Sequence, residues 1–203
     1  MTIIKKMKQH LSSATEARKY LYNNILEKYN RDKISCFRQE CHGCCYEAVG
    51  ISMAEAIDIV IFLIVENKWK NLQEKIEQRA AEEAAIETNN IREFADIWWK
   101  MALKCVFLNE KNRCSIYPIR PFPCAGIFSL SDFHKCYPPK IETVANVSSV
   151  IYGQCQWTWA EEMKKNMGVE MVFSHRFCYL ILQAHRKISG MIKAKKRKGF
   201  PTL

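Results

Sequence analysis

Residues 36–45 read Cys-Phe-Arg-Gln-Glu-Cys-His-Gly-Cys-Cys and place four thiols within ten residues, those of Cys36, Cys41, Cys44 and Cys45. A second set of four follows over thirty-two residues, at Cys105, Cys114, Cys124 and Cys136. Core cysteines do not need such spacing, because a buried thiol packs as a small apolar group. Metal ligands do need it, because thiolates that bind zinc, copper(I) or an iron–sulfur centre must converge within a few ångströms. The sequence therefore predicts a metal site.

The spacing within each set limits how the thiols are used. Cys41 and Cys44 are separated by two residues, which is typical of a turn that binds zinc or iron. Cys44 and Cys45 are adjacent, and adjacent side chains diverge, so one ligates while the other packs or serves a second metal. The second set is too widely spaced to be diagnostic alone. Together the eight thiols allow two four-ligand sites, or one cluster with spare cysteines.

Length and composition indicate the compartment and the class of protein. The chain has 203 residues, the length of one ordinary domain, and 48% of them are hydrophobic. The N-terminus has no apolar segment of the secretory type, and the longest apolar run, residues 59–65, is too short for a transmembrane segment. We therefore expect a cytoplasmic protein. Cytoplasmic thiols are kept reduced, which favours metal ligation over the alternative of a secreted disulfide scaffold.

The apolar pattern predicts a mainly α fold that forms a single domain over residues 1–203. Helices are predicted over residues 3–29, 53–65, 69–88, 91–101, 158–167 and 175–196. The second helix follows a capping box, Ser52-Met-Ala-Glu55, and its body is apolar nearly all round, which predicts burial. Flanking helices in residues 1–35 and 156–203 are thus expected to surround a cysteine-bearing region at residues 36–140.

The cysteine region itself predicts little regular structure. The polar stretch Asn109–Asn112 between Cys105 and Cys114 predicts a short β-hairpin. Five of the six prolines lie between Pro118 and Pro139, which indicates irregular loops or a short helix around Ile119. Residues 144–151 indicate one strand or a buried turn. Metal–ligand bonds are one way to hold such loops together.

The cysteine motifs match a known family. Cys41-His-Gly-Cys44-Cys45, then Cys105-Val-Phe-Leu, then Cys114-Ser-Ile-Tyr-Pro-Ile-Arg-Pro-Phe-Pro-Cys124 resembles the cysteine-cluster family of YkgJ type over about residues 36–140. Its members carry eight cysteines and are described as zinc- or iron-chelating or iron–sulfur-cluster proteins. The resemblance implies a set of metal ligands: Cys36, Cys41, Cys44, Cys45, Cys105, Cys114, Cys124 and Cys136. One departure is the four-residue gap after Cys36, where the family often has two.

Three functional hypotheses follow. In the first, the protein is a metal-binding protein whose helices present a surface to a protein partner. Iron–sulfur or iron is favoured over zinc here, because eight thiols and the Cys44-Cys45 pair fit a cluster with spare ligands. In the second, it is an iron–sulfur-dependent protein-modifying enzyme, since the flagellin lysine N-methylases share this cysteine region. In the third, it binds RNA or DNA, because the net charge is +10 and basic residues accumulate at Lys193–Lys198.

Other side chains near the motifs are interpreted more simply. His42 and His134 are expected to be outer or exposed groups rather than ligands. Arg120 is left open between binding an anionic substrate, neutralising the metal centre and pairing with a buried carboxylate. The remaining candidates are expected to be core, rim or surface groups: Tyr117, Trp98, Trp99, Trp157, Trp159, Cys155, Cys178, His10, His175 and His185.

Overall fold

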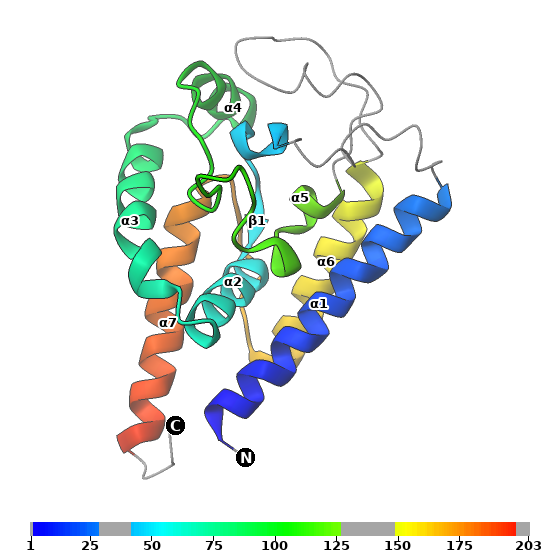
Figure 1. The fold of residues 1–203 in the computed structure, drawn as a ribbon, viewed down its shortest axis with the longest axis vertical. Helices are drawn as coiled ribbons and strands as arrows, with labels where there is room; N and C mark the ends of the chain where they lie inside the picture. The colour runs from blue at the N-terminus through cyan, green and yellow to red at the C-terminus, as the bar shows by residue number, and fades with distance from the viewer. Residues whose placement is uncertain (1, 29–41, 127–148, 198–203) are drawn as a thin grey trace.

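The computed structural model describes residues 2–28, 42–126 and 149–197, and these residues are mainly helical, as the sequence predicts (Figure 1). The described α-helices are α1 (Ile3–Lys28), α2 (Met53–Val65), α3 (Trp69–Ala85), α4 (Ile91–Lys100), α5 (Phe122–Gly126), α6 (Ser149–Met167) and α7 (Phe177–Arg197). Two 3-10 helices, η3 (Gly43–Tyr46) and η4 (Tyr117–Ile119), are described in the cysteine region. None of the described helices is both long enough and apolar enough to cross a membrane.

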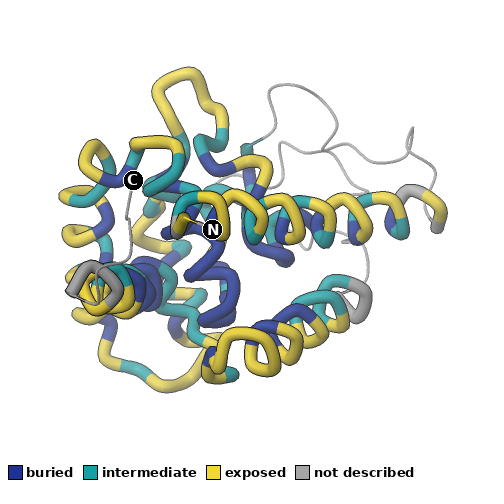
Figure 2. Tube along the Cα trace, turned by 90° about the horizontal axis from the view of Figure 1, so that it is seen from below, coloured by how far each residue is buried: buried dark blue, intermediate teal, exposed yellow. Residues whose placement is uncertain are grey.

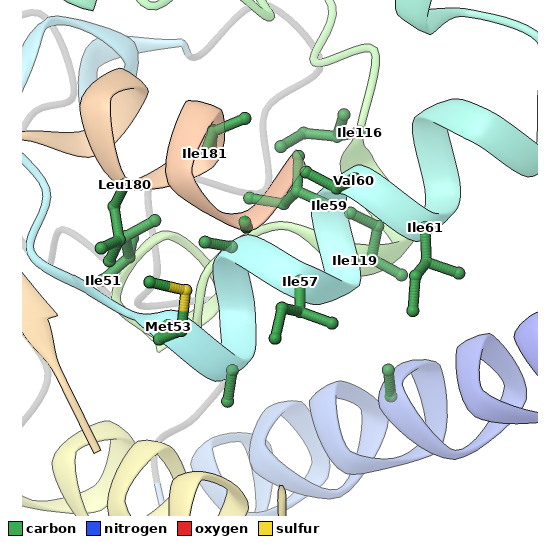
Figure 3. Packing of buried hydrophobic residues seen from close by; sticks show 14 of the residues in the cluster. Ile51, Met53, Ile57, Ile59, Val60, Ile61, Ile116, Ile119, Leu180 and Ile181 are labelled. Carbon is green, nitrogen blue, oxygen red and sulfur yellow. The ribbon is translucent and has the colours of Figure 1, made fainter. Parts of the chain in front are cut away.

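Helix α2 is the centre of the core. The predicted capping box is confirmed, because the Glu55 N–H donates to Ser52 Oγ at 3.2 Å and the Ser52 N–H donates to the Glu55 carboxylate at 2.7 Å. Ten of the thirteen residues of α2 are buried. Figure 1 shows α1 and α6 on one side of α2 and α3 and α7 on the other. Figure 3 shows Ile57 and Ile59 of α2 in the same apolar cluster as Leu180 of α7.

Helix α1 packs along one face only. Its buried apolar residues recur at multiples of about one helical turn, at Met7, Ala14, Leu21 and Ile25. Figure 2 shows this alternation, with exposed residues on the outer side of α1. The apolar stripe predicted for residues 3–29 is therefore the stripe that the fold buries against α2 and α5.

A buried carboxylate fixes α1 and α6 to α2. Asp58 is fully buried, and its oxygens lie 2.7 Å from His10 Nε2, 2.8 Å from Arg18 Nη2 and 2.9 Å from Trp159 Nε1. Arg18 also donates from Nε to the Arg120 carbonyl oxygen at 3.0 Å. The same contacts that join α1 to α2 therefore position the chain segment that leads into α5.

The two-stranded sheet was not predicted from the sequence. Strand β1 (Ile51–Ser52) pairs antiparallel with β2 (Phe173–Ser174), with Ile51 opposite Ser174 and Ser52 opposite Phe173. Strand β1 leads directly into α2 and β2 ends two residues before α7, so their pairing connects the segments that lead into the two helices. The hairpin predicted between Cys105 and Cys114 is reduced to one antiparallel bridge, between Leu108 and Cys114.

The interpretation of residues 144–151 as a strand or buried turn is wrong where it can be compared. Residues 144–148 lie outside the described residues, but Ser149 onward already belongs to α6, which begins well before the predicted residue 158. Tertiary packing explains the difference, because Tyr152 on this first part of α6 packs against the hydrophobic core. The short helix expected around Ile119 is confirmed as η4 and is followed by α5.

Candidate metal centre

Five of the eight predicted ligands lie in the described residues, and all five line one cavity of about 520 Å³. Cys44 and Cys45 come from η3, Cys105 and Cys114 from the two ends of the loop after α4, and Cys124 from α5. Each of these cysteines is partly buried. Cys36, Cys41 and Cys136, together with His134, lie outside the described residues. Segments that are up to eighty residues apart thus bring their thiols to one place.

The backbone joins the two cysteine sets directly. The Cys105 N–H donates to the Cys45 carbonyl oxygen at 2.7 Å, which ties the loop after α4 to η3. Within η3, the Cys45 N–H donates to the His42 carbonyl oxygen at 2.9 Å, and the Glu47 N–H donates to that of Cys44 at 3.3 Å. The thiols therefore project from a backbone that is hydrogen-bonded across the two segments.

Two of the sulfurs receive backbone hydrogen bonds from residues two positions further along the chain. The Phe107 N–H donates to the Cys105 sulfur, and the Ile116 N–H donates to the Cys114 sulfur. Such hydrogen bonds favour the thiolate form and orient the sulfur, in the way that outer contacts orient metal ligands. The local turn after each of these cysteines is therefore already shaped for a ligand.

The cavity disfavours unpaired thiolates. Burial raises the pKa of Cys105 to about 12 and raises that of Cys124 well above its usual value. The pKa of Cys45 is also raised, chiefly by the hydrogen bond of its side chain with Cys44 and then by burial. A metal ion supplies the positive charge that such thiols need in order to lose their protons. The chemistry of the donor set therefore fits a thiophilic metal.

The described thiols gather at the cavity without forming a coordination sphere. Among the described residues, no group of three or more His, Cys, Asp or Glu side chains is placed so that it could hold a metal ion as it stands. The structure therefore brings five predicted ligands to one cavity, and it leaves the ligand set itself a proposal.

Arginine and aromatic side chains line the same cavity. The Arg120 guanidinium lies 4.2 Å from the centre of the Tyr117 ring, and within the described residues no carboxylate pairs with it. Arg79, by contrast, lies 2.7 Å from the Glu82 carboxylate and stacks on Trp98. Trp98 is buried, as expected, whereas Tyr117 is exposed and does not pack in the core. The Arg120 guanidinium therefore lies against an exposed Tyr117 ring in the lining of the cavity.

Sequence reasoning missed the contribution of residues 175–178 to the cavity. His175, Phe177 and Cys178 all line it, from the start of α7. The His175 ring lies over Gly50, where an added Cβ would come within 2.8 Å of His175 Cε1, so glycine permits the close approach. Cys178 is buried, as predicted, but it also faces the thiols. No local signal marks these residues, because the β1–β2 pairing brings them to the site.

The remaining candidate residues line the cavity, pack in or against the core, or lie at the surface. His42 lines the cavity beside Cys44. His10 binds Asp58, and His185 stacks on Trp69 at 3.8 Å between ring centroids. Cys155 is partly buried, packs against the hydrophobic core and is not among the residues that line the cavity. Lys193 is exposed near the end of α7, and residue 198 lies outside the described residues.

Fold and cavity together define a mainly α protein with a cysteine-lined, metal-binding type of site. The chain matches the model of the CxxCxxCC family, described as a "Putative zinc- or iron-chelating domain", over residues 35–140. This match spans just over half of the chain, and the protein belongs to that family. No match was found among curated proteins or among solved structures. The family description supports zinc or iron chelation and gives no cellular role.

Proposed function

We propose that the protein holds an iron–sulfur cluster, bound through thiolates of the cysteine-lined cavity. The observation that carries the proposal is the convergence of five family cysteines, from three separate segments, on one cavity. The proposed ligands in the described residues are Cys105, Cys114, Cys124 and one of the adjacent pair Cys44 and Cys45. The sequence adds Cys36, Cys41 and Cys136.

The number of thiols and the size of the cavity favour a cluster over a single zinc ion. A structural zinc ion is closed by four ligands and fills the space between them. Here five family thiols are among the residues that line a cavity of about 520 Å³, and the family region contains three further cysteines, Cys36, Cys41 and Cys136. Iron–sulfur clusters are held by four cysteines and need more room than one ion. An iron–sulfur cluster therefore fits the size of the cavity and the number of thiols better than a single zinc ion does.

The first experiment is the analysis of iron, zinc and acid-labile sulfide, with a visible spectrum, on the full chain purified without oxygen. We expect iron and sulfide in comparable amounts and a charge-transfer band. Zinc in stoichiometric amount without sulfide would overturn the cluster and retain a thiolate centre. Absence of both metals after reconstitution would overturn the proposal as a whole.

Two variants connect the measurement to the cavity. Cys114→Ser removes a thiol that lines the cavity and accepts the Ile116 N–H. Cys155→Ser removes a thiol of similar burial that packs elsewhere against the core. We expect Cys114→Ser to lower the iron content and to weaken the charge-transfer band, whereas Cys155→Ser keeps both. Equal behaviour of the two variants would place the cluster outside this cavity.

A second candidate function, a modification enzyme that uses the cluster, is favoured by the basic lining of the cavity. Arg113 and Arg120 line it, and within the described residues neither guanidinium has a carboxylate partner. Unpaired guanidinium groups beside a metal centre suit an anionic substrate or cofactor. Saturable binding of a small anionic ligand by the cluster-loaded protein, lost in Arg120→Gln, would support this function. Identical binding by the variant would count against it.

A further inference from the structure

The cavity includes a sixth thiol that the family region does not supply. Cys178 lies in the first turn of α7, about forty residues beyond the end of the family match at residue 140. It lines the same cavity as the five family cysteines. It also lies close enough to Cys105 for their charges to interact. Cys178 therefore lines the same cavity as the family cysteines in addition to packing in the core.

Glu83 of α3 holds Cys178 in a fixed position. One oxygen of the fully buried Glu83 carboxylate accepts the Cys178 N–H at 3.0 Å, and the other accepts the Tyr179 N–H at 3.0 Å. The Cys178 thiol also forms a side-chain hydrogen bond with Glu83. These contacts fix both the backbone and the sulfur of Cys178, since a carboxylate that accepts two N–H groups caps the first turn of the helix.

The elements around Cys178 keep this geometry. Arg176 donates back from its guanidinium to the carbonyl oxygens of Glu83 and Ile86, so α3 and the start of α7 are bonded in both directions. The Phe177 ring meets the Phe107 ring edge-on, with 5.7 Å between centroids. Phe107 is also the residue whose N–H supports the Cys105 sulfur. The contact between Phe107 and Phe177 therefore connects the chain segments that contain Cys105 and Cys178.

We propose that Cys178 is a further thiolate ligand of the metal bound in this cavity, with Glu83 as its positioning residue. The inference rests on the proposed metal function and adds a ligand from outside the family region. Ligation releases the thiol proton, as it does for every cysteine ligand. Ligation would break the hydrogen bond between this thiol and Glu83, whereas the two backbone hydrogen bonds to Glu83 would keep the start of α7 in place.

Cys155 provides the comparison within the same chain. It is less buried than Cys178, and it too packs against the hydrophobic core, but it does not line the cavity. If simple core packing explained both thiols, they would respond alike to metal. A ligand role for Cys178 requires that they differ.

The test uses the full chain loaded with cadmium-113 and examined by NMR. Cysteines that ligate cadmium-113 show scalar coupling between the metal and their Cβ protons, so the readout names each ligand separately. We expect coupling at Cys178 as well as at Cys105, and none at Cys155. Coupling at Cys105 without coupling at Cys178 would overturn this inference and leave the proposed metal site intact. Absence of coupling at every cysteine would also overturn the ligand role of Cys178, whereas the proposed cluster is decided separately by the iron and sulfide analysis.

Substitution gives a second readout. Cys178→Ser keeps a hydrogen-bond donor for Glu83 and removes the sulfur, so we expect the cadmium–thiolate absorbance to fall by the share of one thiolate. Cys155→Ser is the matched control and should leave the absorbance unchanged. An unchanged absorbance in Cys178→Ser would contradict the ligand role. The NMR measurement on the unsubstituted chain decides the question if Cys178→Ser does not fold.

Discussion

At the scale of single residues, Asp58 is a buried carboxylate that connects three helices. It is fully buried, and groups from α1 and α6 surround its two oxygens. Asp58→Asn keeps the shape but removes the charge that balances Arg18, which is itself only 4% exposed. Breaking a buried ion pair on one side costs about 3–5 kcal/mol, because the other charge is left without compensation. We therefore expect a loss of about 3 kcal/mol in the free energy of unfolding, measured by urea denaturation.

The control for Asp58 is an ion pair on the surface of α1, the helix that carries Arg18. Lys19 Nζ lies 2.7 Å from Glu16 Oε1, and both side chains are more than 60% exposed. Exposed pairs of this kind contribute at most about 1 kcal/mol. Glu16→Gln should therefore change the stability by less than about 0.5 kcal/mol. Similar losses in Asp58→Asn and Glu16→Gln would contradict the central role of Asp58.

His185 is expected to make the stability depend on pH. Burial lowers the pKa of His185, although the nearby Glu77 carboxylate raises it slightly, and the ring stacks on Trp69 and contacts Ser189 Oγ. The folded protein therefore favours the neutral ring, whereas the unfolded chain takes up a proton near the ordinary pKa. Stability supplied by the neutral ring is complete above the unfolded pKa and is lost as the pH falls through that value toward the folded one.

His185→Phe isolates this effect, because phenylalanine retains a ring against Trp69 and does not titrate. Between pH 7.5 and pH 5.5, at ordinary solvent screening, we expect the unsubstituted protein to lose up to about 1 kcal/mol more than the variant. The measurement is the free energy of unfolding at several pH values in the two proteins. Parallel pH profiles would show that His185 does not titrate differently on unfolding.

At the scale of elements, the contact between α5 and α6 depends on a glycine. An added Cβ at Gly126 would lie 2.6 Å from Tyr152 Cβ and 3.3 Å from Leu21 Cδ2. Neither neighbour moves easily, because Tyr152 Cβ is fixed by the backbone of α6 and Leu21 is fully buried. Gly126→Ala should therefore destabilise the protein by about 1–3 kcal/mol, the usual cost of overpacking. Thermal unfolding monitored by circular dichroism is the measurement.

Gly190 is the matched control because the same change should have the opposite sign there. It lies on the exposed side of α7, and an added Cβ meets nothing within 4 Å. Alanine in a helix is favoured over glycine by about 1 kcal/mol, so Gly190→Ala should raise the stability. Destabilisation by Gly190→Ala as well would show that position 190 does not tolerate a side chain.

Elements whose signals are local were predictable from the sequence, and those set by distant contacts were not. The capping box and the apolar body of α2 fix its bounds at Met53 and Val65, as predicted. The β1–β2 pairing joins residues more than one hundred and twenty positions apart and has no local pattern. The early start of α6 has the same cause, since packing of Tyr152 against the core decides it. At the site, cysteine spacing predicted the five family thiols that line the cavity. It did not predict Cys178, which reaches the cavity only through tertiary contacts.

At the scale of the whole molecule, we expect the apolar core and the cysteine-lined cavity to respond differently to the removal of metal. The core is a continuous apolar cluster that includes residues of α1, α2, α6 and α7. The segments around the cavity join the same core through Phe107, Ile116 and Phe122, but their thiols meet at the cavity. Because a bound metal would link these segments directly, we expect it to stabilise them more than the helices.

Removal of metal by a chelator under reducing conditions tests this separation. We expect the helical circular dichroism signal to persist, the melting temperature to fall and more thiols to react with a thiol reagent. A ligand at about a thousand times its Kd stabilises the folded state by about 4 kcal/mol, so the fall in melting temperature should be easily measured. In Cys155→Ser the same shift should occur, because that thiol lies away from the cavity. Loss of the helical signal would show that the helices themselves require metal, and an unchanged melting temperature would show that the native fold binds none.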